Sequence, residues 1–456
     1  MFHSIIEAMD LDGRTPLDYA QLLGQANSAR LLLDAGAIID LEDTKTIENV
    51  PVTGWNAAQK DDIIALLAGE LAARRKQLMH FAITRLTEKD ITNFHLRERA
   101  MLQECALEVV ELLRSQHVNI PACFHTVRPG SIYHTLFMSA TLAEALFNVG
   151  FDNTNIALDG FTPLMMIGLG WLTHRRGLEA TLDLVAWFEE HGADIHTQIP
   201  VTAIQTTTAS TEPVMPRFEV IHRIGFAVGA GCYRTHILES DWRRISQLRR
   251  LIGDESTDSC DCYCARGGCT PAALFARGMF SSYRNSGWNP KWPLLQGMNS
   301  QKSGRSALES TIRGGLELLD SITREGECPP ITETIVRVST FDRLGMIHTC
   351  CSYTEDRSWY DDNELAQKIR DGKYQLVEVM DPADIDEIRE EDRHLAVLLE
   401  SLMEEFVAKL RQRDLLFSEF FYEYWWGRMD EIEQEREEIL DSDRQAMRDI
   451  GVILDE

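Results

Sequence analysis

The sequence lacks an apolar run long enough to cross a membrane, and it lacks a basic leader at its start. A membrane-spanning helix needs about 18 or more consecutive apolar residues, and no stretch of this 456-residue chain supplies them. The first 13 residues contain acidic side chains and no Lys or Arg, so a secretory signal peptide is not expected. We therefore expect the protein to act inside the cell, in the cytoplasm or the nucleus.

Basic residues are also scarce. The chain has 45 Lys and Arg against 72 Asp and Glu, which gives a formal net charge of −27 at pH 7. Proteins that bind nucleic acid neutralise its phosphates with Lys and Arg, and anionic lipid surfaces attract basic segments for the same reason. The charge balance argues against nucleic acid and against a membrane surface as partners.

Familiar catalytic and cofactor-binding motifs are missing as well. Gly229 and Gly231 begin a GxGxxG pattern, but Arg234 stands at its last position, so we expect no dinucleotide-binding loop there. The ten cysteines include no CxxC pair, which argues against a thioredoxin-type redox site. We expect the glycines over 225–231 to serve close helix packing or a turn, and we expect the protein not to be an enzyme.

Residues 12–40, DGRTPLDYAQLLGQANSARLLLDAGAIID, carry the signals of two short helices. Pro16 can begin the first helix, because the N–H that proline lacks would be unpaired at that position. Gly36 follows the second helix, where a left-handed residue commonly ends one. In order and spacing this stretch resembles an ankyrin repeat, with Asp18 where the family usually has His. Apolar residues at 5, 6 and 9 resemble the tail of an earlier helix, so a first helix pair is expected to be shortened or missing.

Residues 158–196 repeat this pattern with a longer connection between the helices. A turn precedes Pro163, apolar residues recur at helical spacing, and Gly192 is expected to end the second helix in the left-handed conformation. This stretch also resembles an ankyrin repeat, with Met165 at the usual His position. Residues 131–134, Ser-Ile-Tyr-His, take the place of the family's Thr-Pro-Leu-His in a degenerate unit just before it.

One helix pair cannot bury its own apolar face, so about three or more stacked units are needed for stability. The resemblance therefore implies an all-α fold, a degenerate ankyrin-type α-solenoid with an additional helical C-terminal region. The expected parts are N-terminal ankyrin-like helices over 1–120, ankyrin-like repeats over 130–196, a polar loop over 197–216, a Cys-rich helical region over 217–380, and acidic aromatic C-terminal helices over 381–456.

The C-terminal region is the most acidic part of the chain. Residues 381–456 contain 24 acidic and 9 basic side chains. From Leu395 to Leu410, apolar residues recur at offsets of three and four, which is the pattern of one continuous helical stripe. We expect this stripe to pack on the repeat stack; docking of a partner, or of a second copy of the chain, remains the alternative.

A cysteine cluster is the densest chemical signal in the sequence. The candidate ligands of a structural zinc ion are Cys260, Cys262, Cys264, Cys269, His348 and Cys350. In an extended strand the first and third of these cysteines would lie about 13 Å apart, whereas sulfurs that share one zinc lie about 4 Å apart. The segment must therefore coil, which Gly267 and Gly268 permit, or the distant segment 348–350 must supply ligands. Buried free thiols and redox chemistry remain open as alternatives.

The two cysteine-bearing segments add a closer resemblance. Together, DxCxCxCxxxGCTP at 258–271 and FDRLGMIHTCC at 341–351 resemble a group of fungal proteins that contain ankyrin repeats. That resemblance implies an architecture, and no activity. GCTP also resembles the start of a further ankyrin unit, so the cysteines would lie in a repeat loop.

The resemblance to ankyrin repeats implies an intracellular protein–protein interaction scaffold whose partner protein binds the repeat surface. Two alternatives stay open. One is a Cys/His-dependent enzyme that uses Cys350 or Cys351 with His348, because an imidazole beside a thiol can activate it; the sequence identifies no Asn or Asp to orient that imidazole. The other is a regulatory subunit of a larger assembly, stabilised by zinc.

Overall fold

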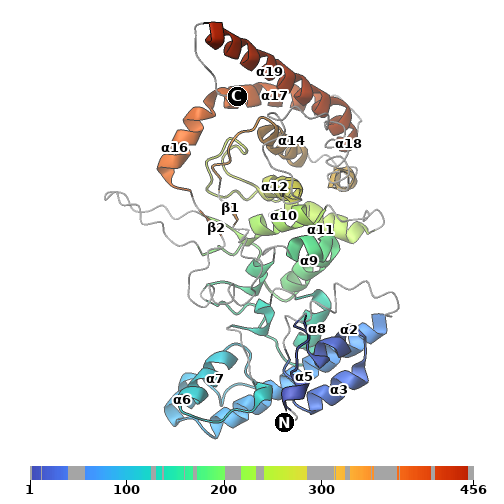
Figure 1. Cartoon of the computed structure of the whole chain (residues 1–456), viewed down its shortest axis with the longest axis vertical. Helices are drawn as coiled ribbons and strands as arrows, with labels where there is room; N and C mark the ends of the chain where they lie inside the picture. Colours follow the sequence, from blue (N-terminus) through green and yellow to red (C-terminus); the bar gives the residue numbers. More distant parts are fainter. Residues whose placement is uncertain are drawn as a thin grey trace. The chain divides into compact units, whose positions relative to one another are not determined.

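The structure is a computed structural model of the chain, and nearly all of its regular secondary structure is helical (Figure 1), as the sequence predicts. It describes residues 3–11, 13–39, 57–124, 130–135, 138–158, 160–167, 172–200, 217–232, 241–284, 313, 315–323, 329–350, 352–353, 377–378, 380–411 and 416–449. Most of the predicted polar loop 197–216 and Cys351 lie outside these residues. The chain divides into two compact units: unit 1 is Met1–Ala203 with Thr354–Val377, and unit 2 is Ile204–Tyr353 with Glu378–Glu456.

Most of the described helices of unit 1 are short, and the two long ones are α5 and α9. They are α1 (His3–Ile6), α2 (Pro16–Leu22), α3 (Ala26–Asp34), α5 (Ala57–Ile83), α6 (Glu88–Asn93), α7 (Ala106–Ser115), η1 (Ala122–Phe124), η2 (Ile132–His134), α8 (Ala140–Asn148), η3 (Pro163–Met166) and α9 (Leu172–Glu190).

The first predicted repeat forms the helix pair α2 and α3. Thr15 and Asp18 close a capping box, in which the Thr15 N–H donates to Asp18 Oδ2 (2.6 Å) and the Asp18 N–H donates to Thr15 Oγ1 (3.3 Å). The residue at the family's His position thus serves the start of its own helix. Gly36 and Gly192 both have left-handed backbones, with φ of 94° and 87°, which confirms the predicted helix ends.

The long helix α5 connects this repeat to its neighbours. Near its start, Ile63 and Leu67 pack on the apolar face of α2 and α3. Further along, Leu78 and Ala82 belong to a separate core shared with α6 and α7. Buried Arg74 lies between these clusters, and its guanidinium donates to the carbonyl oxygens of Leu33 (2.9 Å) and Ala37 (2.5 Å). These carbonyls belong to the end of α3 and the turn after it, where backbone acceptors need partners from elsewhere.

In the degenerate ankyrin-like stretch before residue 158, His134 joins two loops. His134 Nδ1 accepts from the Ser131 N–H (3.2 Å), and Nε2 donates to the Phe161 carbonyl oxygen (2.9 Å) in the loop before η3. Burial lowers the pKa of His134, which favours the neutral imidazole that this pattern of donor and acceptor requires. A partly buried hydrogen bond therefore joins the loop around His134 to the loop before η3.

The described helices of unit 2 come from two parts of the chain, one before and one after its two short strands. They are α10 (Val220–Gly231), α11 (Trp242–Ile252), α12 (Pro271–Arg284), α14 (Pro329–Arg343), α16 (Pro382–Glu391), α17 (Arg393–Arg411), α18 (Phe417–Glu419), η5 (Phe420–Trp425, a π-helix) and α19 (Trp426–Asp449). The two-residue strands β1 (Ser352–Tyr353) and β2 (Val377–Glu378) pair with each other.

Glycines allow α10 and α12 to approach at backbone distance. A Cβ atom added at Gly229 would lie 2.0 Å from the Phe275 carbonyl oxygen, and one at Gly278 would lie 2.1 Å from the Phe226 carbonyl oxygen. The predicted role of the 225–231 segment in helix packing is confirmed. At the start of α10, buried His222 has its Nε2 3.2 Å from the Ser256 carbonyl oxygen, which connects this helix to the loop after α11.

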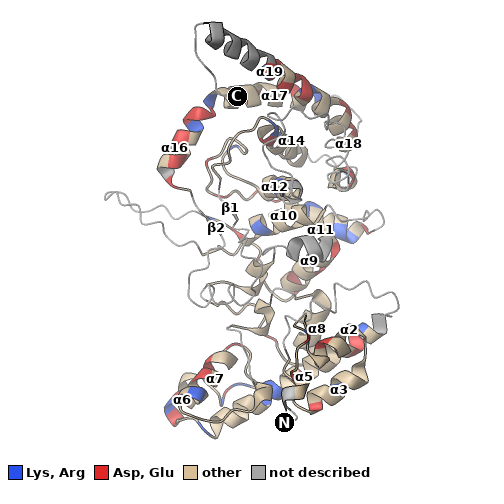
Figure 2. Ribbon diagram, viewed as in Figure 1, with Lys and Arg blue, Asp and Glu red and all other residues tan. Residues whose placement is uncertain are grey.

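The C-terminal helices bury the predicted apolar stripe within unit 2. The buried side chains of α17 are Leu395, Ala396, Leu399, Leu402, Met403 and Phe406, and this helix packs on α14. Trp425 adds a buried hydrogen bond from its indole N–H to Thr340 Oγ1 of α14 (2.9 Å). Asp and Glu residues, red in Figure 2, recur along α16 and the first part of α19. The acidic C-terminal region is thus an integral part of the packing of unit 2.

Candidate metal centre

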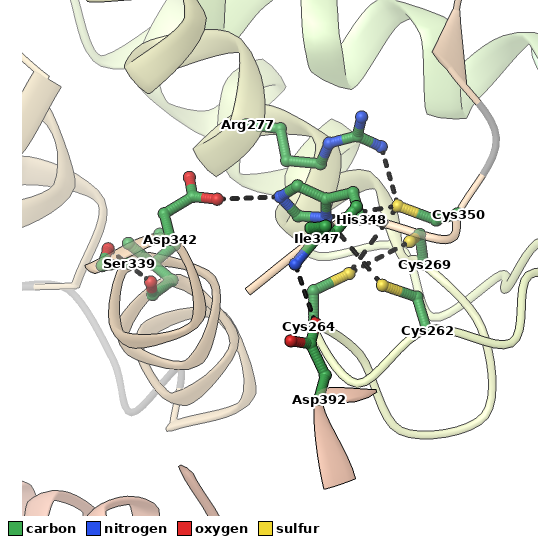
Figure 3. Close-up of polar contacts among 11 residues, drawn as sticks. Cys262, Cys264, Cys269, Arg277, Ser339, Asp342, Ile347, His348, Cys350 and Asp392 are labelled. Carbon is green, nitrogen blue, oxygen red and sulfur yellow. Dashed lines mark hydrogen bonds and ion pairs between the residues drawn. The ribbon is translucent and has the colours of Figure 1, made fainter. Parts of the chain in front are cut away.

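Two loops of unit 2 bring four of the six predicted ligands together. The potential ligand atoms of Cys262, Cys264, His348 and Cys350 all lie within 4.8 Å of one another. The two cysteines at 262 and 264 come from the loop before α12, and the other pair comes from the segment after α14 (Figure 3). These two segments had to lie side by side if one site was to take ligands from both.

The first loop coils as the spacing of its cysteines demands. The Ala265 N–H donates to the Cys262 carbonyl oxygen (3.2 Å), which closes a tight turn around Cys264. Gly267 and Gly268 then have left-handed backbones, with φ of 80° and 112°. This turn replaces the extended strand that would have kept the sulfur atoms far apart.

The distances within the group are short and similar. Cys264 Sγ lies 3.8 Å from Cys350 Sγ. His348 Nδ1 lies 3.4 Å from Cys350 Sγ and 3.9 Å from Cys262 Sγ. Cys262, Cys264 and Cys350 are buried, and the His348 side chain is largely buried. One nitrogen and three sulfur atoms therefore face a common point.

The remaining two predicted ligands belong to a second group. Cys260 and Cys269 have potential ligand atoms within 4.8 Å of each other and of an Asp258 oxygen. The Cys260 thiol donates to Asp258 Oδ2 (2.8 Å), and the Cys269 N–H donates to Asp258 Oδ1 (2.7 Å). Cys269 Sγ also lies 3.8 Å from Cys264 Sγ, so it borders the first group. The structure thus does not bring Cys260 together with the four converging residues.

Asp342 and Arg277, which the sequence reading did not identify, contact the first group. His348 Nε2 lies 2.8 Å from Asp342 Oδ1, on the last turn of α14. The Arg277 guanidinium of α12 donates to Cys350 Sγ at 3.0 Å. The imidazole is therefore held with Nε2 on the carboxylate and Nδ1 towards the sulfur atoms (Figure 3).

Contacts with the neighbouring thiols favour an ionised Cys350. Contacts with Cys262 and Cys264 lower the pKa of the Cys350 thiol to about 6, and Arg277 acts in the same direction. Burial and Arg277 lower the pKa of His348, but the Asp342 carboxylate and Cys350 outweigh them and raise it well above its ordinary value. Negative charge is therefore favoured on Cys350, whereas contacts with the neighbouring thiols raise the pKa of Cys264.

Neighbouring backbone groups fix the second segment against the rest of unit 2. Thr349 Oγ1 donates to the Asp261 carbonyl oxygen (2.8 Å), which joins the two cysteine loops directly. The Ile347 N–H donates to Asp392 Oδ2 (2.9 Å) at the junction of α16 and α17. The site is therefore held by four segments: the loop before α12, α12 itself, the end of α14 and the junction before α17.

Comparison with known proteins finds an ankyrin repeat near the start of the chain. The family model of the ankyrin repeat matches residues 12–44, the stretch that contains α2 and α3. This match supports an ankyrin-repeat protein, as the sequence predicts, and ankyrin repeats generally mediate protein–protein interaction. No curated protein and no solved structure matches the chain. No helix among the described residues is long and apolar enough to span a lipid bilayer.

Proposed function

We propose that the protein is an intracellular scaffold, an ankyrin-type α-solenoid that binds a partner protein through its repeat surface. The observation that carries this proposal is the ankyrin repeat at residues 12–44. Stacked repeats present extended surfaces that suit the binding of other proteins.

Contacts between neighbouring helices support a solenoid in each unit. In unit 1, α3 packs on α5, α5 on α8, and α8 on α9. In unit 2, α10 packs on α12, α12 on α14, and α14 on α17. The hydrogen bonds of His134 and His222 to a following loop add links of the kind that tie consecutive repeats together. These contacts follow the order of the helices along the chain, as stacked units require, but α5 also packs on α8, which lies beyond α6 and α7 in the sequence.

The apolar surface of the first repeat supports its use in binding. Most of the exposed large apolar side chains among the described residues lie in the first repeat or in the short stretch before it: Ile5, Met9, Leu11, Tyr19, Leu23 and Leu31. Concentrations of exposed apolar side chains often mark interaction sites. Leu31 lies in α3 with 71% of its surface exposed, while Ala29 and Leu33 of the same helix are buried. The first repeat is therefore where we expect the partner to bind.

Replacing Leu31 by Asp should abolish capture of the partner and leave the fold intact. An exposed substitution usually changes stability by less than about 0.5 kcal/mol, whereas a charge in an apolar contact region costs about 1.4 kcal/mol or more, a tenfold loss of affinity. Val397→Asp is the matched control, because Val397 is 70% exposed on α17 of unit 2. Quantitative affinity capture with mass spectrometry compares the wild type and both variants.

The expected result is one stoichiometric partner retained by the wild type and by Val397→Asp and lost by Leu31→Asp. Equal capture by both variants would place the binding surface elsewhere. Self-association of the wild type in sedimentation, abolished by Leu31→Asp, would assign the surface to a second copy of the chain.

An enzyme with Cys350 as its nucleophile is the second candidate, and one observation favours it. Asp342 orients His348 from the side opposite Cys350, which supplies the acid that the sequence left unidentified. Two observations oppose it. Cys350 is only 4% exposed, and its Sγ lies beside further thiols. Reactive thiolates need access to solvent as well as a lowered pKa.

Alkylation by iodoacetamide at neutral pH distinguishes these functions. Cys350 should stay unmodified in the folded protein, while the partly exposed Cys123 serves as the reacting control. Peptide mapping by mass spectrometry measures both residues in the same sample. Rapid stoichiometric modification of Cys350 before Cys123 reacts would favour the enzyme over the scaffold.

A further inference from the structure

We propose that unit 2 binds one structural zinc ion through Cys262 Sγ, Cys264 Sγ, Cys350 Sγ and His348 Nδ1. These are four of the six ligands that the sequence suggested, and the geometry selects them over Cys260 and Cys269. The proposal does not depend on what the repeats bind. It assigns the cysteine cluster a role within unit 2.

The distances fit the edges of a zinc tetrahedron. With Zn–S near 2.3 Å and Zn–N near 2.0–2.1 Å, tetrahedral angles give S···S edges of about 3.8 Å and S···N edges of about 3.5 Å. The Cys264–Cys350 edge is 3.8 Å, and the edges from His348 Nδ1 are 3.4 and 3.9 Å. Since every pair of these donor atoms lies within 4.8 Å, one ion can reach all four.

The surroundings of His348 are those of a metal ligand. A histidine bound to a metal almost always donates its other ring N–H to a carboxylate, a carbonyl or water. Asp342 Oδ1 lies 2.8 Å from Nε2 and accepts that proton, so Nδ1 faces the sulfur atoms and can bind a metal ion in place of a proton. Packing on the Phe341 ring, with centroids 4.5 Å apart, fixes the plane of the imidazole. Buried free thiols alone would not need an imidazole oriented in this way.

The donor set selects the kind of metal and the kind of site. Three thiolates and one imidazole are the ligands of tetrahedral structural zinc. Three thiolates around a divalent cation leave one negative charge in excess, and the guanidinium of Arg277 offsets it through its contact with Cys350 Sγ. All four positions are filled by protein atoms, so the ion has no open position for a substrate. Its role is to clamp the loop before α12 to the segment after α14.

Cys260 lies outside the ligand set because its thiol is engaged elsewhere. It donates to Asp258, whose other oxygen accepts the Cys260 and Cys269 N–H groups at 3.1 and 2.7 Å. Asp258 therefore organises the loop, and no ion is needed to explain its contacts. Cys260 thus provides a control within the same motif.

Metal content per chain tests the proposal on full-length protein purified under reducing conditions. Inductively coupled plasma mass spectrometry should find one zinc in the wild type and in Cys260→Ser, and a loss of at least tenfold in Cys262→Ser. X-ray absorption spectroscopy is measured on the wild type alone, so its result does not depend on whether a variant folds. It should fit three Zn–S bonds near 2.3 Å and one Zn–N bond near 2.0–2.1 Å.

Several results would overturn the assignment. They are a wild type without stoichiometric zinc, iron in its place, or zinc lost equally from Cys260→Ser. A zinc ion with four sulfur ligands and no nitrogen would replace His348 by Cys269 and would also refute the ligand set proposed here.

Discussion

Removal of the proposed zinc ion should lower the melting temperature of unit 2 by about 8–16 °C and leave the ankyrin repeat of unit 1 unchanged. A ligand present at about 1,000 times its dissociation constant stabilises the folded state by about 4.1 kcal/mol. For a domain of 150–250 residues, each 1 kcal/mol shifts the melting temperature by about 2–4 °C. The site connects two loops, and among the described residues a hydrogen bond from Thr349 Oγ1 to the Asp261 carbonyl oxygen also joins them. Loss of the ion would remove the stronger connection, so we expect both loops to loosen.

Thermal unfolding with and without a zinc chelator measures this effect. Hydrogen exchange followed by mass spectrometry then assigns it to segments: protection should fall at 258–270 and 346–350 and stay constant at α2 and α3. Cys262→Ser is the control, because a variant without zinc should not respond to the chelator. An unchanged melting curve after the metal has been removed would show that the cluster contributes nothing to stability.

The first repeat was predictable because its signals are local. Pro16 begins α2 and Gly36 ends the second helix through backbone preferences that act within one or two residues. The histidine of the degenerate unit was predictable by position, since His134 occupies the fourth place of the Ser-Ile-Tyr-His segment. Its acceptor, the Phe161 carbonyl, depends on how the next unit stacks, and no residue type marks it.

The kind of site was predictable from the sequence, but the set of residues that form it was not. Alternating spacing grouped Cys260 with Cys262 and Cys264, whereas the turn at Ala265 and the contact with Asp258 separate it from them. Asp342 precedes His348 by six residues, a separation that carries no signal in a straight helix. The two meet because α14 ends at Arg343 and the chain reverses after it, where Gly345 has φ of 76°.

Partners at long range were the least accessible from the sequence. Arg277 and Cys350 are 73 residues apart, and Arg74 reaches carbonyls 37 and 41 residues away. An arginine in a helix usually faces solvent, so the residue type alone predicts an exposed side chain at both positions. The packing of α12 and α5 on their neighbours decides which arginine side chains contact the buried Cys350 thiol or the buried carbonyl groups.

Replacing Gly229 by Ala in α10 should destabilise unit 2 by about 3 kcal/mol, the upper part of the range for overpacked sites. The new Cβ would lie 2.0 Å from the Phe275 carbonyl oxygen and 2.8 Å from its carbon, so backbone atoms must move. No side-chain rotation can relieve this contact, because the obstructing atoms belong to the main chain of α12. The two helices must separate, and the apolar contacts between them must loosen.

Gly427→Ala in α19 is the matched control for this substitution. Gly427 is also helical and belongs to the same unit, but nothing lies within 4 Å of an added Cβ. Ala is the better helix former by about 0.8–1.0 kcal/mol, so this variant should be neutral or slightly more stable than the wild type. Urea unfolding of both variants measures the difference. Equal midpoints would contradict the close approach of α10 and α12.

Gly278→Ala extends the test to the other side of the same interface. Its Cβ would lie 2.1 Å from the Phe226 carbonyl oxygen, so the cost of this variant should resemble that of Gly229→Ala. The double variant should cost clearly less than the sum, because the first substitution already separates the helices and residues at one interface do not act independently. Full additivity would mean that each glycine relieves a separate local clash and that α10 and α12 do not move as a pair.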